Sequence, residues 1–199
     1  MAPKKRRKKA PAPEDDWKST LFCWRGRVVE EPVEEEALDG GAARATWTGT
    51  WVGCGHGEAR PTDADHAASE NTFALGFEID HTPWDPAARE YEFAGAYLLD
   101  QGDGSGLSEY RDHTHVVRFG PAGDDGARPC AAVGTTEFAP FVSFGELRAD
   151  GTLLLARRYL EEDDARCGWD ADEALNSDVG DPLAWERLTD VGTGLVTFC

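Results

Sequence analysis

The stretch NTFALGFEID, residues 71–80, decides the fold class, because its hydrophobic side chains recur at every second position. The large apolar residues of this stretch are Phe73, Leu75, Phe77 and Ile79. In an extended chain they point to one face, while the small and polar residues between them point to the other. This period of two predicts a half-buried β-strand, with one face in a hydrophobic core and one in water.

The same period returns in YEFAGAYLL, residues 91–99, where the aromatic side chains again share one face. Between the two stretches lies PWDP, residues 83–86. Proline has no backbone N–H to donate to a neighbouring strand, so this segment cannot continue either strand. We expect a loop that joins two strands adjacent in the sheet.

Further short runs of aromatic and β-branched residues are separated by Gly, Pro and Asp, which is typical of strands and turns. An Asp150-Gly151 pair marks a hairpin, because both residues tolerate positive φ. Predicted strands besides those above cover residues 20–29, 45–53, 113–119, 130–136, 138–148, 152–160 and 194–198. Two short helices are expected, at 171–176 and, after the Asp181-Pro182 start signal, at 183–188.

Eight or nine sequential antiparallel strands with short connections must hide their edges. The sequence therefore predicts an all-β fold, an eight- to nine-stranded up-and-down barrel or a curved half-barrel, with the two short helices near the C-terminus. The chain has 199 residues, enough for one core. We expect a disordered basic tail over residues 1–16 and a single β domain over residues 17–199, with neither a signal peptide nor a membrane span.

Charge divides the chain into the same two parts. The formal net charge is -18, yet all six charges in residues 1–10 are positive. The remainder therefore carries 14 basic against 38 acidic residues, a net charge of -24. Such a surface repels nucleic acid, so we expect nucleic acid to contact only the tail. The acidic domain suits a basic protein partner, or serves simply as a well-solvated surface.

The tail contains the basic run Lys4, Lys5, Arg6, Arg7, Lys8 and Lys9. Beyond Lys18 every cation is arginine, so the lysine cluster runs against the composition of the rest of the chain. The run resembles a monopartite nuclear localisation signal. That resemblance implies a nuclear import receptor as partner and a nuclear location, or a cytoplasmic one where the run is not read as a signal. The same charges would also support a tether to nucleic acid or to an anionic membrane.

Two tryptophans flank a glycine in TWTGTW, residues 46–51. The Gly49-Thr50-Trp51 triplet resembles the glycine-x-tryptophan signature on the first strand of calycin barrels, the lipocalin and avidin-type ligand carriers. A predicted strand at 20–29 precedes it here, which departs from that order. The resemblance implies an interior that binds a small ligand and is lined by Trp51, Phe77, Phe93 and Tyr97. The alternative is that these aromatic side chains fill the core.

Residues able to hold a metal are scattered. The five cysteines are widely spaced without a CxxC pair, which predicts reduced thiols packed as small hydrophobic groups. His113 and His115 share one face of an uninterrupted strand, and Cys54 and His56 lie in a glycine-rich segment. Two ligands do not make a metal site, so no metal and no cofactor is predicted.

Glu78 and Asp80 share a strand face and resemble the acidic strand motif of jelly-roll glycoside hydrolases, but the second glutamate of that motif is missing. No catalytic residue is therefore assigned. The sequence predicts a non-enzymatic binding or interaction module directed to the nucleus. Two alternatives remain open: a calycin-like carrier of a small ligand, and a hydrolase whose groups, Glu78, Asp80 and Glu137 with His115, converge only in the fold.

Overall fold

The computed structural model describes residues 20–31, 43–55, 58–79, 84–87, 90–100 and 106–177. The predicted tail over residues 1–16, the helix at 183–188 and the strand at 194–198 lie outside these ranges. The predictions that concern those segments are therefore carried forward as predictions.

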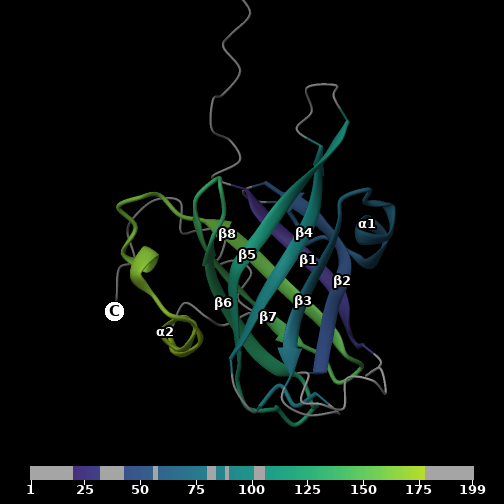
Figure 1. The fold of residues 1–199 in the computed structure, drawn as a ribbon, viewed down its shortest axis with the longest axis vertical. Coiled ribbons are helices and arrows are strands. Elements are labelled where there is room, and N and C mark those ends of the chain that lie inside the picture. The colour runs from purple at the N-terminus through teal and green to yellow at the C-terminus, as the bar shows by residue number, and fades with distance from the viewer. Residues whose placement is uncertain are drawn as a thin grey trace, which may run out of the picture.

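Eight antiparallel strands form a closed barrel in which each strand pairs with its neighbours in the chain (Figure 1). The strands are β1 Leu21–Glu30, β2 Ala43–Cys54, β3 Thr72–Ile79, β4 Tyr91–Asp100, β5 Leu107–Phe119, β6 Arg128–Thr135, β7 Pro140–Leu147 and β8 Thr152–Tyr159. Pairing of β1 with β8 closes the barrel, with Phe22 opposite Arg157 and Arg27 opposite Thr152. The predicted up-and-down barrel is confirmed, and it is closed, which leaves no free sheet edge in the barrel.

Aromatic side chains dominate the inside of the barrel. The alternation of β3 is confirmed, since Phe73, Leu75, Phe77 and Ile79 are all buried in the interior core. Trp47 and Phe93 from the neighbouring strands are fully buried in the same core. The rings contact one another directly, for example Phe77 and Phe93, which stack with centroids 4.3 Å apart. Such aromatic pairs stabilise the core beyond their buried area.

Glycine lets β1 and β2 approach very closely. Gly26 and Gly49 are directly opposite in the register of the two strands. A Cβ atom placed on Gly49 would lie 2.0 Å from the carbonyl oxygen of Arg25, and one on Gly26 would lie 2.8 Å from the indole nitrogen of Trp47. The glycine between the two tryptophans of the TWTGTW stretch is thus required by backbone contact, and the absence of a side chain at Gly26 leaves space for the Trp47 ring.

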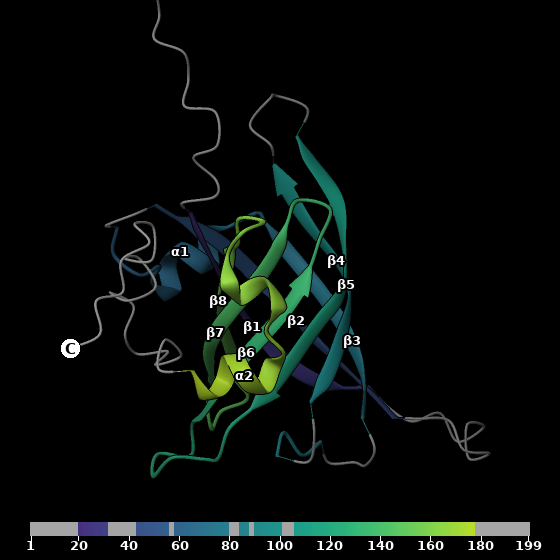
Figure 2. The ribbon, with the colours of Figure 1, turned by 90° about the vertical axis from the view of Figure 1, so that its left-hand side faces the viewer.

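Two short helices cover the outside of the barrel. Helix α1, Asp63–Ala68, lies beside β2 and begins with a capping box formed by Thr62 and Asp65. Helix α2, Ala171–Asn176, was predicted from sequence and packs over β6 (Figure 2). Its Ala174 joins an outer hydrophobic cluster with Ala131, Val142, Phe144, Leu21 and Leu160. Among the described residues no helix is long and apolar enough to cross a membrane.

Replacing Gly49 with alanine tests the close approach of β1 and β2. Because the new methyl group would overlap backbone atoms, we expect Gly49→Ala to lower the free energy of unfolding by about 2 kcal/mol or more. Gly76→Ala is the matched control, since the nearest atom to its Cβ would lie at 3.6 Å. Urea unfolding followed by tryptophan fluorescence measures both. Equal stability of the two variants would contradict the steric argument.

Candidate functional site

A β-bulge on β5 places two polar side chains inside the barrel. Phe93 of β4 is opposite His115, whereas Gly95 is opposite Asp112, so two residues of β5 face one residue of β4. Asp112 and His115 consequently share the inner face although they are three residues apart. Both are buried, with exposures of 0% and 1%. The prediction that His113 and His115 share one strand face assumed a regular alternation, which the bulge interrupts. The His113 side chain itself lies outside the described part of the structure.

Arg157 reaches this pair from β8. Its Nη2 atom donates to Asp112 Oδ2 at 2.6 Å and lies 3.1 Å from His115 Nδ1. The guanidinium carbon is 3.8 Å from the ring centre of Phe141 and 4.5 Å from that of Trp24. The Arg157 side chain is entirely shielded from solvent. A planar, weakly hydrated cation between aromatic faces is the geometry in which arginine is best tolerated in a core.

The charge states of the three polar groups follow from their mutual contacts. Burial opposes ionisation of Asp112, but the Arg157 cation and His115 outweigh it and hold the pKa of this carboxyl well below its usual range. Burial lowers the pKa of His115, which is therefore neutral at pH 7. His115 Nδ1 lies 3.1 Å from Arg157 Nη2, which can only donate, and 3.5 Å from Asp112 Oδ2, which can only accept. The site thus contains one ion pair and a neutral imidazole.

Many polar atoms around this ion pair have no hydrogen-bond partner among the described residues. They are Trp24 Nε1, Trp47 Nε1, Asp112 Oδ1, His115 Nε2, Ser143 Oγ, and Nε and Nη1 of Arg157. Their residues form one contiguous group, because Trp24 contacts Trp47 and Tyr97, and Ser143 is opposite Arg157 in the sheet. The Tyr159 side chain interacts with both Tyr97 and Arg157. A buried polar atom left unpaired costs about 1–3 kcal/mol, so a group of this size calls for water or a ligand as partner.

Aromatic side chains close the end of the barrel nearest this group. They are Phe22, Trp51, Tyr97, Tyr110, Phe138 and Tyr159, whose rings contact one another in sequence around the mouth. Trp51 is anchored by its indole N–H, which donates to the carbonyl of Leu98 at 3.0 Å. Phe22, Tyr110 and Phe138 are only partly buried, so they form the outer part of this closure.

The four ligand-lining residues predicted from sequence all lie inside the barrel. Tyr97 and Phe93 border the polar group, with Phe93 5.8 Å from the His115 ring. Trp51 belongs to the closed mouth, and Phe77 lies toward the other end, against Trp84 and Tyr91. Sequence reasoning missed Trp24, Asp112, Ser143 and Arg157 as members of the site. The one available signal was Arg157 itself, an inward position in the apolar run LLLARRYL, residues 153–160.

The groups named for a hydrolase lie in different places. Glu78 and Glu137 are exposed, His115 is buried inside the barrel, and Asp80 lies outside the described residues. Within the described ranges, no three His, Cys, Asp or Glu side chains gather in a way that could hold a metal. Cys23, Cys54, Cys130 and Cys167 are free thiols, and burial raises the pKa of Cys23 to about 12.

No protein-family model, curated protein or solved structure matches the chain. The closed antiparallel barrel of eight strands is consistent with a calycin-like fold.

A double-mutant cycle measures how strongly Arg157 and Asp112 depend on each other. Arg157→Met or Asp112→Asn alone leaves a buried charge unpaired, and we expect each to lower the free energy of unfolding by about 3–5 kcal/mol. The double variant should lose at least about 1 kcal/mol less than the sum. Arg27→Met is the control, because its pair with Asp150 is exposed and 3.7 Å long. Additive losses in chemical unfolding would contradict the ion pair.

Proposed function

We propose that this protein is a calycin-like binding protein that holds a small polar ligand inside its barrel, next to Arg157. The observation that carries the proposal is the group of buried, unpartnered polar atoms around the Arg157–Asp112 ion pair. A core whose only role was packing would be more stable with apolar side chains at these positions. Binding provides a reason to keep them.

The polar atoms also indicate the chemistry of the ligand. Arg157 and Asp112 already neutralise one another, so a second full charge in this closed space would be unfavourable. Four of the unpartnered atoms can only donate, namely two indole N–H groups and two guanidinium nitrogens. Asp112 Oδ1 is the single atom that can only accept. These atoms suit a compact, uncharged ligand with several acceptor oxygens and at least one donor.

Entry to the interior would take place through the aromatic mouth. Phe22, Tyr110 and Phe138 are partly buried and form its outer layer. They rest on the rings of Trp51, Tyr97 and Tyr159, and rotation about their side-chain bonds would open a path. A ligand bound below them would be shielded from water.

The N-terminal tail adds a second part to the proposal, a nuclear localisation signal. The lysine-rich run at residues 4–9 would engage an import receptor and bring the barrel, or an interaction surface on its acidic exterior, into the nucleus. The hydrolase alternative has less support, because Glu78 and Glu137 are exposed while His115 is enclosed. No described arrangement brings them to one substrate.

Ser143→Ala tests the binding role without damaging the fold. The Ser143 hydroxyl is fully buried and has no hydrogen-bond partner among the described residues, so its removal should leave the free energy of unfolding within about 0.5 kcal/mol or raise it. Native mass spectrometry of the protein purified from its own cells should show an added small-molecule mass, at clearly lower occupancy in Ser143→Ala. Thr72→Ala, at an exposed position on the outer face of β3, is the control. A wild-type protein carrying no added mass, together with a destabilised variant, would indicate structural water instead.

Alanine substitution of residues 4–9 tests the proposed nuclear localisation signal. A fluorescent fusion of the full chain should accumulate in the nucleus, and the alanine variant should equilibrate between nucleus and cytoplasm. Changing Lys4, Lys5, Lys8 and Lys9 to arginine keeps the charge and should preserve accumulation. Nuclear accumulation of the alanine variant equal to that of the wild type would rule out this import signal.

A further inference from the structure

The outer face of the barrel has a small cleft whose charge is opposite to that of the domain. It lies between β1, β8, the β7–β8 turn and the segment that leads into α1, and it encloses about 50 Å³. Its charged lining residues are three arginines, Arg25, Arg60 and Arg148, and one aspartate, Asp63. Residues 11–199 carry 14 cations against 38 acids, so three cations and one acid around one cleft reverse the local balance.

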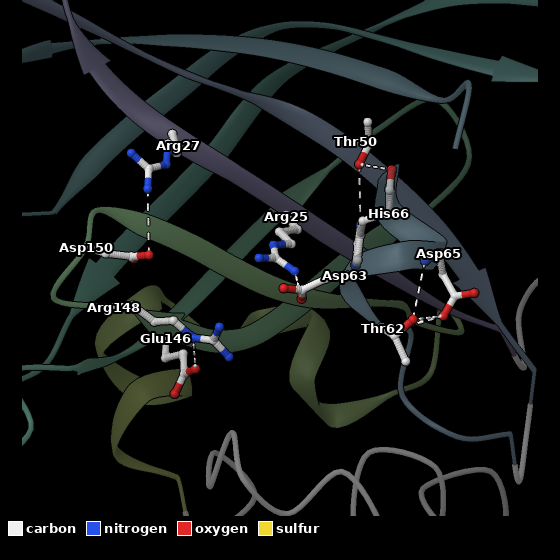
Figure 3. Close-up of polar contacts among 10 residues, drawn as sticks. All are labelled: Arg25, Arg27, Thr50, Thr62, Asp63, Asp65, His66, Glu146, Arg148 and Asp150. Carbon is white, nitrogen blue, oxygen red and sulfur yellow. Dashed lines mark hydrogen bonds and ion pairs between the residues drawn. The ribbon is translucent and has the colours of Figure 1, made fainter. Parts of the chain in front are cut away.

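The arginines are arranged so that an incoming anion can reach them. Arg25 is paired with Asp63, whose side chain is 81% exposed (Figure 3). Arg148 is 44% exposed and donates from Nε to Glu146 at 2.8 Å, which leaves its remaining N–H groups available. Arg60 is exposed, and no described carboxylate forms an ion pair with it. Exposed pairs of this kind are weak and exchange readily with another anion.

The floor of the cleft is neutral. Burial raises the pKa of the Cys23 thiol to about 12, so it does not ionise. His66 is held beside Thr50, and burial, followed by the nearby Arg25, lowers its pKa. It is neutral at pH 7. No negative group of the floor opposes an anion.

The volume of the cleft limits the size of the anion that it can hold. One water molecule needs roughly 10–15 Å³ in a cavity, so the cleft has room for roughly three to five waters. That is the size of a tetrahedral oxyanion rather than of an extended acidic peptide. The net negative charge of the remaining surface does not prevent its approach, because charges further away than about 8 Å are largely screened at physiological ionic strength.

We propose that the cleft lined by Arg25, Arg60 and Arg148 binds a tetrahedral oxyanion, the phosphate or sulfate group of a ligand. Arginine matches the oxygens of such groups with paired N–H donors. Asp63 is displaced from Arg25 as the anion enters. This site is on the outside of the barrel and is independent of ligand binding in the interior.

Titration of the full chain with sodium sulfate and with sodium phosphate, at constant ionic strength, tests the proposal. Saturable binding is expected by isothermal titration calorimetry, with chemical-shift changes in the His66 ring, and sodium acetate should bind at least about tenfold more weakly. Arg60→Gln and Arg25→Gln should each weaken sulfate binding about tenfold or more.

Arg27→Gln is the matched control, because Arg27 lies on the same strand but outside the cleft, beside Asp150 (Figure 3). It should retain wild-type affinity. Absence of saturable binding up to about 50 mM sulfate, equal binding of acetate, or an equal loss in Arg27→Gln would each overturn the proposal. Circular dichroism of all variants confirms that the barrel is intact, and Ser143→Ala should bind sulfate as the wild type does, which separates this site from the interior one.

Discussion

The ion pair between Arg157 and Asp112 is the interaction around which the interior of this barrel is organised. A charged guanidinium with no exposure to solvent requires a counter-ion and polarisable neighbours, and both are supplied by strands far apart in the sequence. Asp112 comes from β5, while Trp24 and Phe141 stack on the cation from β1 and β7. The barrel must close correctly before any of these contacts exists. The barrel therefore closes, and its polar interior forms, only when the strands pair in this one register.

Two departures from a regular sheet make this interior possible. The bulge on β5 turns both Asp112 and His115 inward, where a regular strand would send one of them to the outside. The Gly26–Gly49 pair brings β1 and β2 together and leaves space for the Trp47 ring beside the polar group. Each feature weakens the local strand. A bulge interrupts the ladder of backbone hydrogen bonds, and a glycine has no side chain to pack. Features of this kind concentrate where a fold serves a ligand.

Sequence patterns predicted the fold well because they report on local alternation. The inward face of β3, the loop after it and the turn at Asp150-Gly151 were all evident from a period of two and from turn residues, and Gly151 indeed has a φ of 82°. The first half of β5 was missed, because Leu107 to Asp112 is mostly polar. Helix α1 was missed too, since six residues give too short a pattern.

Only half of the candidate site could be predicted from the sequence, because sequence patterns report on local alternation. Aromatic lining residues such as Phe93 and Tyr97 follow from strand alternation. The pairing of Arg157 with Asp112 joins residues 45 positions apart and depends on a bulge that no single-sequence signal marks. The arginines of the outer cleft likewise come from separate segments, Arg25 from β1 and Arg60 from the segment before α1. Their convergence is a property of the closed barrel.

A crystal structure at atomic resolution, of protein purified from its own cells, tests the central claim most directly. The atoms to inspect are Asp112 Oδ1, Ser143 Oγ and Arg157 Nη1. Our account predicts connected density for a small non-protein molecule within hydrogen-bonding distance of at least two of them. Separate water peaks at each atom, or side chains rearranged to satisfy one another with no density between them, would contradict the binding function proposed for this barrel.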